Sequence, residues 1–354
     1  MSSSIGVGLI GYGAWGKYHA QAIQSTPGCE LRAIVARSES TRKEAAETGA
    51  AVYESIPEMV KRNDIQMVDI VAPNHVHEAA ALAAIEHGKH VLLEKPMSTS
   101  TESCDRILEA ARKAGVRLLI GHEMRFSPLY ATIRQLIDSG RIGEPRYVLI
   151  DLWRRPYRSG SDGWRLDPAR VGNWILEEPV HYFDVASWYL DRQGAPRSVY
   201  AWGNQRKPTF DRSSPTNDNF TAMIQYANGA YAVISHSLCA VEYHISIKVF
   251  GEKAALRAEW HAELDRSEHP EFSLEISEGD RMTPLVVPGT PGEHFELKEE
   301  IAAMVRAVRD GGALPITPEE GRRAVALCQE AIRSLATGQV VQLDRAAPGA
   351  GHGD

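Results

Sequence analysis

The sequence predicts an α/β protein: an N-terminal Rossmann domain with a doubly wound parallel sheet, then an α/β domain with an open, mostly antiparallel sheet. Three observations carry this. Short apolar runs alternate with helix-length segments in the first third. Strand patterns dominate after about Glu123. The 354 residues exceed what one hydrophobic core usually serves. We expect domains at 1–123 and 124–345 and a disordered tail at 346–354.

The first domain is built from alternating strands and helices. Each predicted strand is a short apolar or β-branched run, and a segment with a helix pattern follows each of the first four runs. We expect strands at 4–11, 31–37, 67–73, 90–96 and 117–123, and helices at 15–25, 40–48, 77–88 and 101–114. Strands this short, separated by helices, pair in parallel within a sheet covered on both faces.

The second domain opens on a helix and then turns to strands. The dipeptide Asn228-Gly229 between two alternating runs is a strong hairpin signal. Two helical patterns follow the strands. We expect helices at 128–144, 297–311 and 319–338, and strands at 146–155, 198–205, within 219–240 and within 243–260.

Composition excludes several function classes. The chain has 39 basic and 46 acidic residues, 43% apolar residues and no Lys/Arg-rich patch, which argues against a nucleic-acid partner. No apolar run approaches membrane-spanning length, and we expect no secretory leader because the N-terminal residues run directly into the first predicted strand. The four cysteines form no CxxC pair. We therefore expect a reduced, cytoplasmic setting without nucleic-acid or membrane partners.

A glycine-rich turn follows the first predicted strand. The letters GYGAWG fit the pattern GxGxxG, in which the glycines permit a tight turn, approach of a pyrophosphate and close helix packing. The helix N-terminus adds amide donors and partial positive charge. We therefore expect a dinucleotide to contact Gly11, Tyr12, Gly13, Ala14, Trp15 and Gly16.

The end of the second strand decides between cofactors. An acid about 20 residues past the motif would bind the ribose of NAD, but Ala36, Arg37 and Ser38 stand there. A guanidinium and a hydroxyl can bind a 2′-phosphate instead. The sequence therefore predicts NADP(H) as the preferred cofactor through Arg37 and Ser38. The alternative is NAD(H), with Arg37 as a solvated surface residue.

The stretch HVLLEKPMS contains a motif that resembles one of a known protein family. Its Glu94-Lys95-Pro96 resembles the Glu-Lys-Pro motif of the Gfo/Idh/MocA oxidoreductases, and blocks in family order extend over nearly the whole chain. The resemblance implies enzymes that oxidise or reduce sugars, inositols and related polyols with NAD(H) or NADP(H). It also implies a homodimer or homotetramer formed through the C-terminal sheet.

The segment WILEEPVHYFD carries two acids and a histidine in apolar surroundings, which requires either partners or a chemical role. The family has an acid and, four residues on, a histidine; Glu177 and His181 match that spacing, with Pro179 in place of a glycine. The resemblance implies His181 as acid/base and Lys95 as the group that stabilises the substrate oxygen. Glu177 would pair with the His181 ring, and Glu178 is the alternative.

Further positions match family stretches beside the cofactor and the substrate. The expected cofactor neighbours are Ala72, Pro73, Asn74, His77, Glu94 and Lys95. The expected substrate contacts are Lys95, Arg125, Trp164, Arg165 and His181. Arg125 is alternatively an anchor at the domain junction, and Asp184 is either a helix residue or support on the substrate side. No third ligand completes the His75 and His77 pair, so we predict no metal site.

Two other functions fit the same fold. One is a glycoside hydrolase that uses tightly held NAD in transient redox chemistry. The other is a sugar-responsive regulator without catalysis, which the retained lysine and histidine disfavour. The aromatic residues around His181 do not identify a particular sugar or polyol, and the direction of the reaction is equally open.

Overall fold

The structure, a computed structural model, describes residues 4–205 and 217–343. By contacts the chain forms two compact units. The first unit comprises the described parts of Met1–Tyr130, Arg158–Asp184 and Thr290–Ala326, and the second comprises those of Ala131–Tyr157, Val185–Gly289 and Leu327–Asp354. Two later segments of the chain belong to the first unit, so no single position in the sequence divides the two units. The predicted domain boundary near residue 123 stays a prediction. The predicted disordered tail lies outside the described residues.

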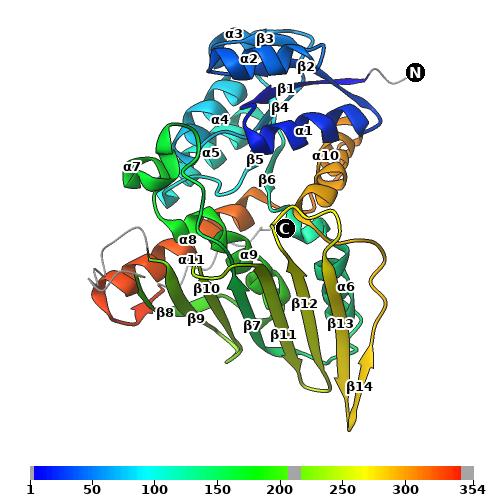
Figure 1. The fold of residues 1–354 in the computed structure, drawn as a ribbon, viewed down its shortest axis with the longest axis vertical. Coiled ribbons are helices and arrows are strands. Elements are labelled where there is room, and N and C mark those ends of the chain that lie inside the picture. Colours follow the sequence, from blue (N-terminus) through cyan, green and yellow to red (C-terminus); the bar gives the residue numbers. More distant parts are fainter. Residues whose placement is uncertain (1–3, 206–216, 344–354) are drawn as a thin grey trace, which may run out of the picture. The chain divides into compact units, whose positions relative to one another are not determined.

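The first unit contains a six-stranded parallel sheet in the order β3-β2-β1-β4-β5-β6 (Figure 1). Its central strands are buried along nearly their whole length, as expected for a sheet covered on both faces. The strands are β1 (Ile5–Ile10), β2 (Cys29–Val35), β3 (Ala51–Tyr53), β4 (Met67–Ile70), β5 (His90–Glu94) and β6 (Leu118–Gly121). The predicted doubly wound sheet is confirmed.

Helices connect these strands, and their ends follow local chemistry. In α5, the Ser100 hydroxyl accepts a hydrogen bond from the Ser103 amide at 3.2 Å, and Gly115 ends the helix at φ 65°. The helices and 3-10 turns wholly within the unit are α1 (Ala14–Ser25), α2 (Glu39–Ala46), α3 (Ile56–Val60), η1 (Asn74–Val76), α4 (His77–Glu86), α5 (Thr101–Ala114), η2 (Glu123–Phe126), η3 (Ser161–Leu166), α7 (Pro168–Val171), α8 (Trp174–Glu177) and α10 (Glu293–Asp310).

The second unit contains a nine-stranded sheet in the order β14-β13-β12-β11-β7-β10-β9-β8-β15. Every neighbouring pair is antiparallel except β10 and β7. The strands are β7 (Pro145–Trp153), β8 (Pro196–Asn204), β9 (Asn219–Tyr226), β10 (Tyr231–Ser237), β11 (Tyr243–Gly251), β12 (Ala255–Ala262), β13 (Glu271–Glu278), β14 (Arg281–Pro284) and β15 (Val341–Gln342). The predicted open, mostly antiparallel sheet is confirmed, including the hairpin at Asn228-Gly229.

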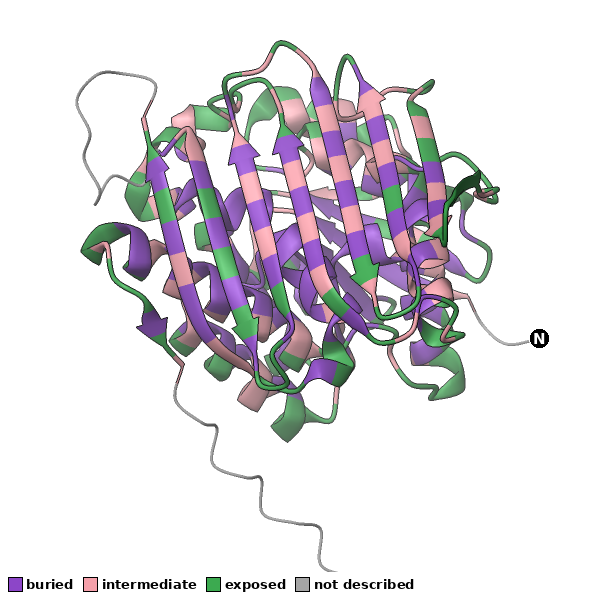
Figure 2. Cartoon of the chain, turned by 90° about the horizontal axis from the view of Figure 1, so that it is seen from below, coloured by how far each residue is buried: buried purple, intermediate pink, exposed green. Residues whose placement is uncertain are grey.

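One face of the nine-stranded sheet lies open, as Figure 2 shows. Along β7, β9, β10 and β11 buried residues alternate with intermediate or exposed ones, so each of these strands presents about one side chain in two to this face. The opposite face packs on helices: Ser187 of α9 (Pro179–Tyr189) lies 3.2 Å from the Tyr226 hydroxyl, and Ser334 of α11 (Pro318–Thr337) accepts from the Ala201 amide.

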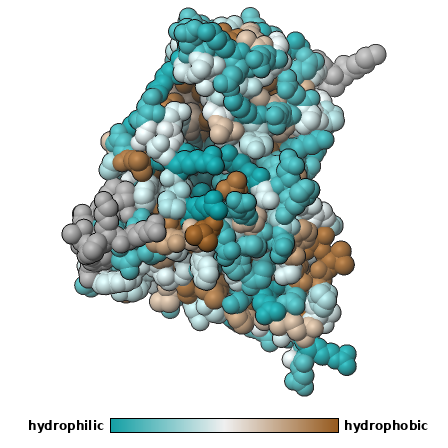
Figure 3. Space-filling view, viewed as in Figure 1, coloured by the Kyte–Doolittle hydropathy of each residue, from teal (hydrophilic) through white to brown (hydrophobic). Residues whose placement is uncertain are grey.

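The remaining elements are the helix α6 (Pro128–Asp138) and the 3-10 turn η4 (Asp191–Gln193). Among the described residues, every helix is too short or too polar to span a lipid bilayer. On the face drawn in Figure 3, hydrophilic residues cover most of the region of α2 and α3.

Candidate active site

The glycine turn leaves room for a ligand at the N-terminus of α1. A Cβ at Gly11, where φ is 101°, would lie 2.2 Å from the Val71 carbonyl oxygen, and one at Gly16 would lie 2.2 Å from that of Gly11. Packing therefore requires both glycines. A Cβ at Gly13 would meet nothing within 4 Å, so this position faces open space beside the amides of α1. This arrangement fits the pyrophosphate of a dinucleotide.

A buried network ties α1 to the strand that carries the Glu-Lys-Pro motif. The Trp15 indole donates to Glu94 Oε1 at 2.9 Å, and His19 lies 2.8 Å from Asp69 and 3.1 Å from Glu94. Burial opposes charge on His19, but the two carboxylates outweigh it and raise its pKa to about 10. The predicted cofactor neighbours Trp15 and Glu94 are thus bonded to each other, which holds the glycine turn against β5.

The loop after β4 joins two other parts of the first unit. The His77 ring lies 2.7 Å from the Pro96 carbonyl oxygen and 2.8 Å from that of Ala72. The Asn74 amide donates to the Val171 carbonyl and to Glu177 Oε2, both at 3.2 Å. His77 is therefore engaged by backbone, whereas Asn74 connects the predicted cofactor loop to the predicted catalytic segment.

A break between two helices places Lys95 next to Glu177. Helix α8 ends at Glu177, and Pro179 starts α9. In a continuous helix the His181 amide would donate to the Glu177 carbonyl. Here it donates to the Glu178 carbonyl instead. The Glu177 carbonyl is thereby left to accept from Lys95 Nζ at 2.7 Å. Pro179, which stands where the family usually has a glycine, thus starts a new helix and leaves the Glu177 carbonyl available to Lys95.

Acidic neighbours keep Lys95 charged. Burial alone would lower the pKa of Lys95, but the nearby carboxylates, Glu177 first, raise it. For Glu177, burial is outweighed by Arg165 and Lys95, which hold its pKa below the usual value. Its carboxylate accepts from Arg165, whose guanidinium lies 4.5 Å from the centre of the Trp164 ring. The site therefore contains an ammonium and an ionised carboxylate at neutral pH.

The carboxylate at ion-pair distance from the His181 ring belongs to Glu123, which the sequence did not single out. His181 Nε2 lies 3.4 Å from Glu123 Oε1. The carboxylate contacts of Glu177 are instead with Arg165 and Asn74, so the expected pairing of Glu177 with the ring is wrong. Arg165 and Asn74 draw this carboxylate away from the histidine four residues on. Only the position of Glu123 just after a buried strand could have indicated it.

Burial makes His181 neutral. The side chain is 1% exposed, and burial, the Lys95 ammonium and His122 lower its pKa well below 6.5. Its Nδ1 has no hydrogen-bond partner among the residues the structure describes. Burial and repulsion by Glu94 raise the pKa of Glu123 well above its usual value. An imidazole with a free ring nitrogen is the form that accepts a proton.

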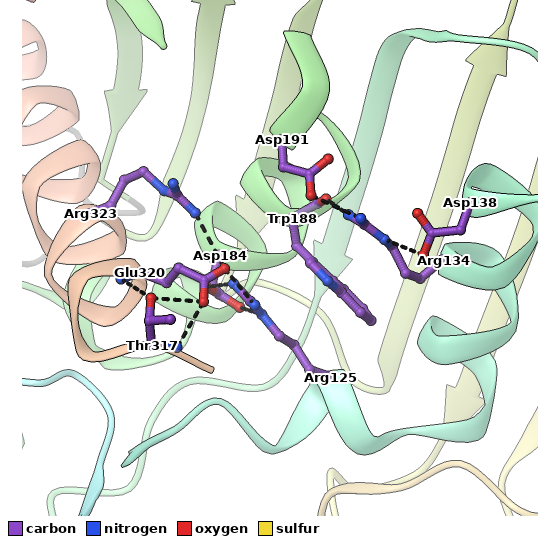
Figure 4. A network of polar contacts seen from close by, with 9 residues as sticks. All are labelled: Arg125, Arg134, Asp138, Asp184, Trp188, Asp191, Thr317, Glu320 and Arg323. Atoms are coloured by element: carbon purple, nitrogen blue, oxygen red, sulfur yellow. Dashed lines mark hydrogen bonds and ion pairs between the residues drawn. The ribbon is translucent and has the colours of Figure 1, made fainter. Parts of the chain in front are cut away.

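Arg125 is engaged by acids within the protein, as Figure 4 shows. Its guanidinium donates twice to Asp184, at 2.6 and 2.7 Å, and once to Glu320 at 2.8 Å. Asp184 lies on α9 and Glu320 on α11, so the arginine fixes the helix that carries His181. Arg125 and Asp184 therefore have structural roles within the first unit, where they bind each other.

The residues after β2 make contacts of their own. The Ser38 hydroxyl caps α2 by accepting from the Thr41 amide at 3.2 Å. The Arg37 guanidinium forms an ion pair with Asp162.

Among the described residues no group of three or more His, Cys, Asp or Glu side chains has a metal-binding arrangement.

Fold and site together define an oxidoreductase built on a nucleotide-binding Rossmann domain. The chain belongs to the Gfo/Idh/MocA family: residues 5–122 match "Oxidoreductase family, NAD-binding Rossmann fold", and residues 130–257 match "GFO/IDH/MocA C-terminal domain". The predicted family, fold class and enzyme class, an NAD(P)-dependent oxidoreductase, are confirmed.

Relatives match the chain over nearly its full length. The uncharacterized oxidoreductase YrbE of Bacillus subtilis is 30% identical, over 97% of this chain and 98% of its own. The scyllo-inositol 2-dehydrogenase (NADP(+)) IolW of the same organism is 25% identical, over 96% of each chain. The crystal structure of apo scyllo-inositol dehydrogenase from Lactobacillus casei is 23% identical with a TM-score of 0.79, covering 97% of this chain and 99% of that one, and shows the same fold.

Proposed function

We propose that the protein is a dehydrogenase that transfers hydride between a nicotinamide cofactor and an alcohol carbon of a sugar, inositol or related polyol. The relative IolW, named for scyllo-inositol and NADP, supports this substrate class. When bound, the nicotinamide supplies or accepts the hydride. The protein's own side chains then handle the proton and the charge on the substrate oxygen.

His181 is the acid/base in this proposal. Its Nδ1 would take the alcohol proton, since Nε2 faces the Glu123 carboxyl group at 3.4 Å. A proton on Nε2, facing that oxygen, would leave the Nδ1 lone pair free. Glu123 then orients the ring, the role expected of Glu177. Glu177 acts instead by holding Arg165 and, through its carbonyl, Lys95.

Lys95 stabilises negative charge that develops on the substrate oxygen. The observation that carries the proposal is that Lys95 and His181 lie in one compact unit, close enough for the ammonium to lower the pKa of the imidazole. In the same unit Arg165 donates to Glu177 and its guanidinium lies over the Trp164 ring, and both residues are proposed to contact the substrate.

The test is a panel of sugars, inositols and other polyols with NAD and with NADP, followed at the absorbance band of the reduced nicotinamide. Reduced cofactor appearing with at least one polyol supports a dehydrogenase. Glycoside cleavage without net cofactor reduction would point to the hydrolase alternative. Sugar binding without turnover on any member of the panel would point to a regulator.

We propose NADP(H) as the preferred cofactor, with Arg37 as the residue that binds the 2′-phosphate. Arg37→Ala is expected to weaken NADPH binding about tenfold to a hundredfold, because a charged hydrogen-bonding partner is lost. NADH binding should hardly change, since NADH lacks that phosphate. Fluorescence titration of both nucleotides measures this. Equal losses for NADH and NADPH would show that Arg37 does not select the cofactor.

We also propose that the open face of the nine-stranded sheet mediates self-association into a dimer or tetramer. Three aromatic side chains stack across neighbouring strands at one register level: Tyr147 lies 4.4 Å from Tyr231 and 5.2 Å from Phe250, centre to centre. Trp153, Trp202 and Met223 are about half exposed. Such an apolar surface is typical of a protein interface.

Phe250→Glu is expected to dissociate the oligomer toward the 39.0 kDa monomer, because a carboxylate would replace an apolar contact in the interface. Light scattering measures the mass. Phe295→Glu is a matched control, since Phe250 and Phe295 are both 40% exposed and Phe295 lies on α10 of the first unit. A monomeric wild-type protein, or equal dissociation by both variants, would refute the interface.

A further inference from the structure

A segment of the first unit remote in sequence from the glycine turn carries an unusual backbone. Asp162 has φ 54°, and among the described residues it is the only non-glycine residue with positive φ. Gly160 and Gly163 on either side also have positive φ, at 73° and 68°. A non-glycine residue held in this region is uncommon and is found preferentially at functional sites.

The turn directs Asp162 to the end of β2. Its carboxylate forms an ion pair with Arg37, and its carbonyl accepts from Arg170 Nη1 at 3.0 Å. The same segment is tied to the loop after β4, where Asn74 donates to the Val171 carbonyl. Two predicted cofactor residues, Arg37 and Asn74, are thus contacted by residues of one segment, 158–172.

Chemistry at this position distinguishes the two nucleotides. In Rossmann folds an acid at the end of the second strand accepts from the ribose hydroxyl of NAD, and an arginine there accommodates the 2′-phosphate of NADP. Here β2 ends at Val35, and no acid stands at the end of this strand. A carboxylate nevertheless reaches Arg37, because Asp162, 125 residues further along the sequence, forms an ion pair with it. The arginine therefore already has an anionic partner.

We propose that Asp162 is a specificity-determining residue, whose carboxylate competes with the 2′-phosphate of NADP for the Arg37 guanidinium. This rests on the proposed binding of a nicotinamide dinucleotide. Both side chains are accessible, with 74% of Arg37 and 68% of Asp162 exposed. An exposed ion pair is weak and can be exchanged for another anion. NADP binds by replacing the carboxylate on Arg37, whereas NAD leaves the pair in place.

Asp162→Asn tests this, because asparagine tolerates positive φ and removes only the charge. NADPH binding should tighten about threefold to fivefold, the range expected from losing one exposed ion pair. NADH binding should not tighten. Fluorescence titrations of NADH and NADPH measure both. Glu39→Gln is the matched control: Glu39 is 74% exposed in the same unit, but its partner is Lys43.

A second arm separates competition from simple repulsion. When Arg37 is already alanine, Asp162→Asn should no longer change NADPH binding, because no guanidinium is left to compete for. Equal changes for NADH and NADPH, the same tightening in Glu39→Gln, or an undiminished effect without Arg37 would each overturn the inference. If wild-type protein binds neither nucleotide, the proposed function fails instead.

Discussion

His181→Ala is expected to lower kcat by about a hundredfold to ten-thousandfold while cofactor binding is retained, because general acid/base catalysis contributes that much. The imidazole is buried and neutral, with its pKa well below 6.5 and with Nδ1 available among the described residues. The wild-type rate should therefore persist below pH 6.5 and be lost only as pH falls through that lowered pKa. Steady-state kinetics across pH measures both effects.

Chemical rescue supplies the control for this variant. Imidazole added to the buffer should restore part of the activity of His181→Ala, and an alkylamine should not, because only imidazole replaces the missing base. A variant that keeps most of its kcat, or a pH profile with an unchanged acid limb, would remove His181 from the mechanism.

Lys95→Ala is expected to reduce kcat by about a hundredfold to a thousandfold with the cofactor still bound, since the glycine turn remains. Loss of the ammonium also removes a positive charge that lowers the pKa of His181. That pKa should rise, and the acid limb of the remaining activity should move to higher pH. Kinetics and nucleotide titration of the variant measure these effects. An alkylamine should rescue this variant, and imidazole should not.

Lys89 offers a matched control for Lys95. It lies just before β5, whereas Lys95 follows the other end, and both ammonium groups donate to backbone carbonyls. Lys89→Ala should cost stability but leave kcat close to that of the wild type. Near-normal turnover of Lys95→Ala, or equal kinetic losses in the two variants, would contradict the role of Lys95.

Local patterns in the sequence predicted most of the first unit. The glycine turn, the Glu-Lys-Pro strand and α5 lie where periodicity and capping residues indicate them. The strand β3 and the helix α3 were not predicted, because three and five residues are too few for a period to show. The strands β13 and β14 were missed as well. They lie at one edge of the sheet, where β14 is exposed throughout and has no alternating pattern.

The spacing of the motifs predicted Lys95, Glu177 and His181 as candidate site residues. It could not predict which of their side chains and backbone groups are in contact. Glu177 and His181 are four residues apart, a spacing that would place them on one face of a continuous helix. The break at Pro179 turns the Glu177 carbonyl toward Lys95, while Arg165 and Asn74 hold its carboxylate. The carboxylate beside the His181 ring is that of Glu123, which lies 58 residues earlier in the sequence (181 − 123).

By itself the sequence determined the family, the two sheets and the residue types of the site, because these follow from local periodicity, glycine geometry and motif order. Only the tertiary structure decided the partners of each charged group: Glu123 beside His181, Asp184 on Arg125 and Asp162 on Arg37. Electrostatic contacts depend on distance in space, and chain folding sets that distance without regard to separation along the sequence.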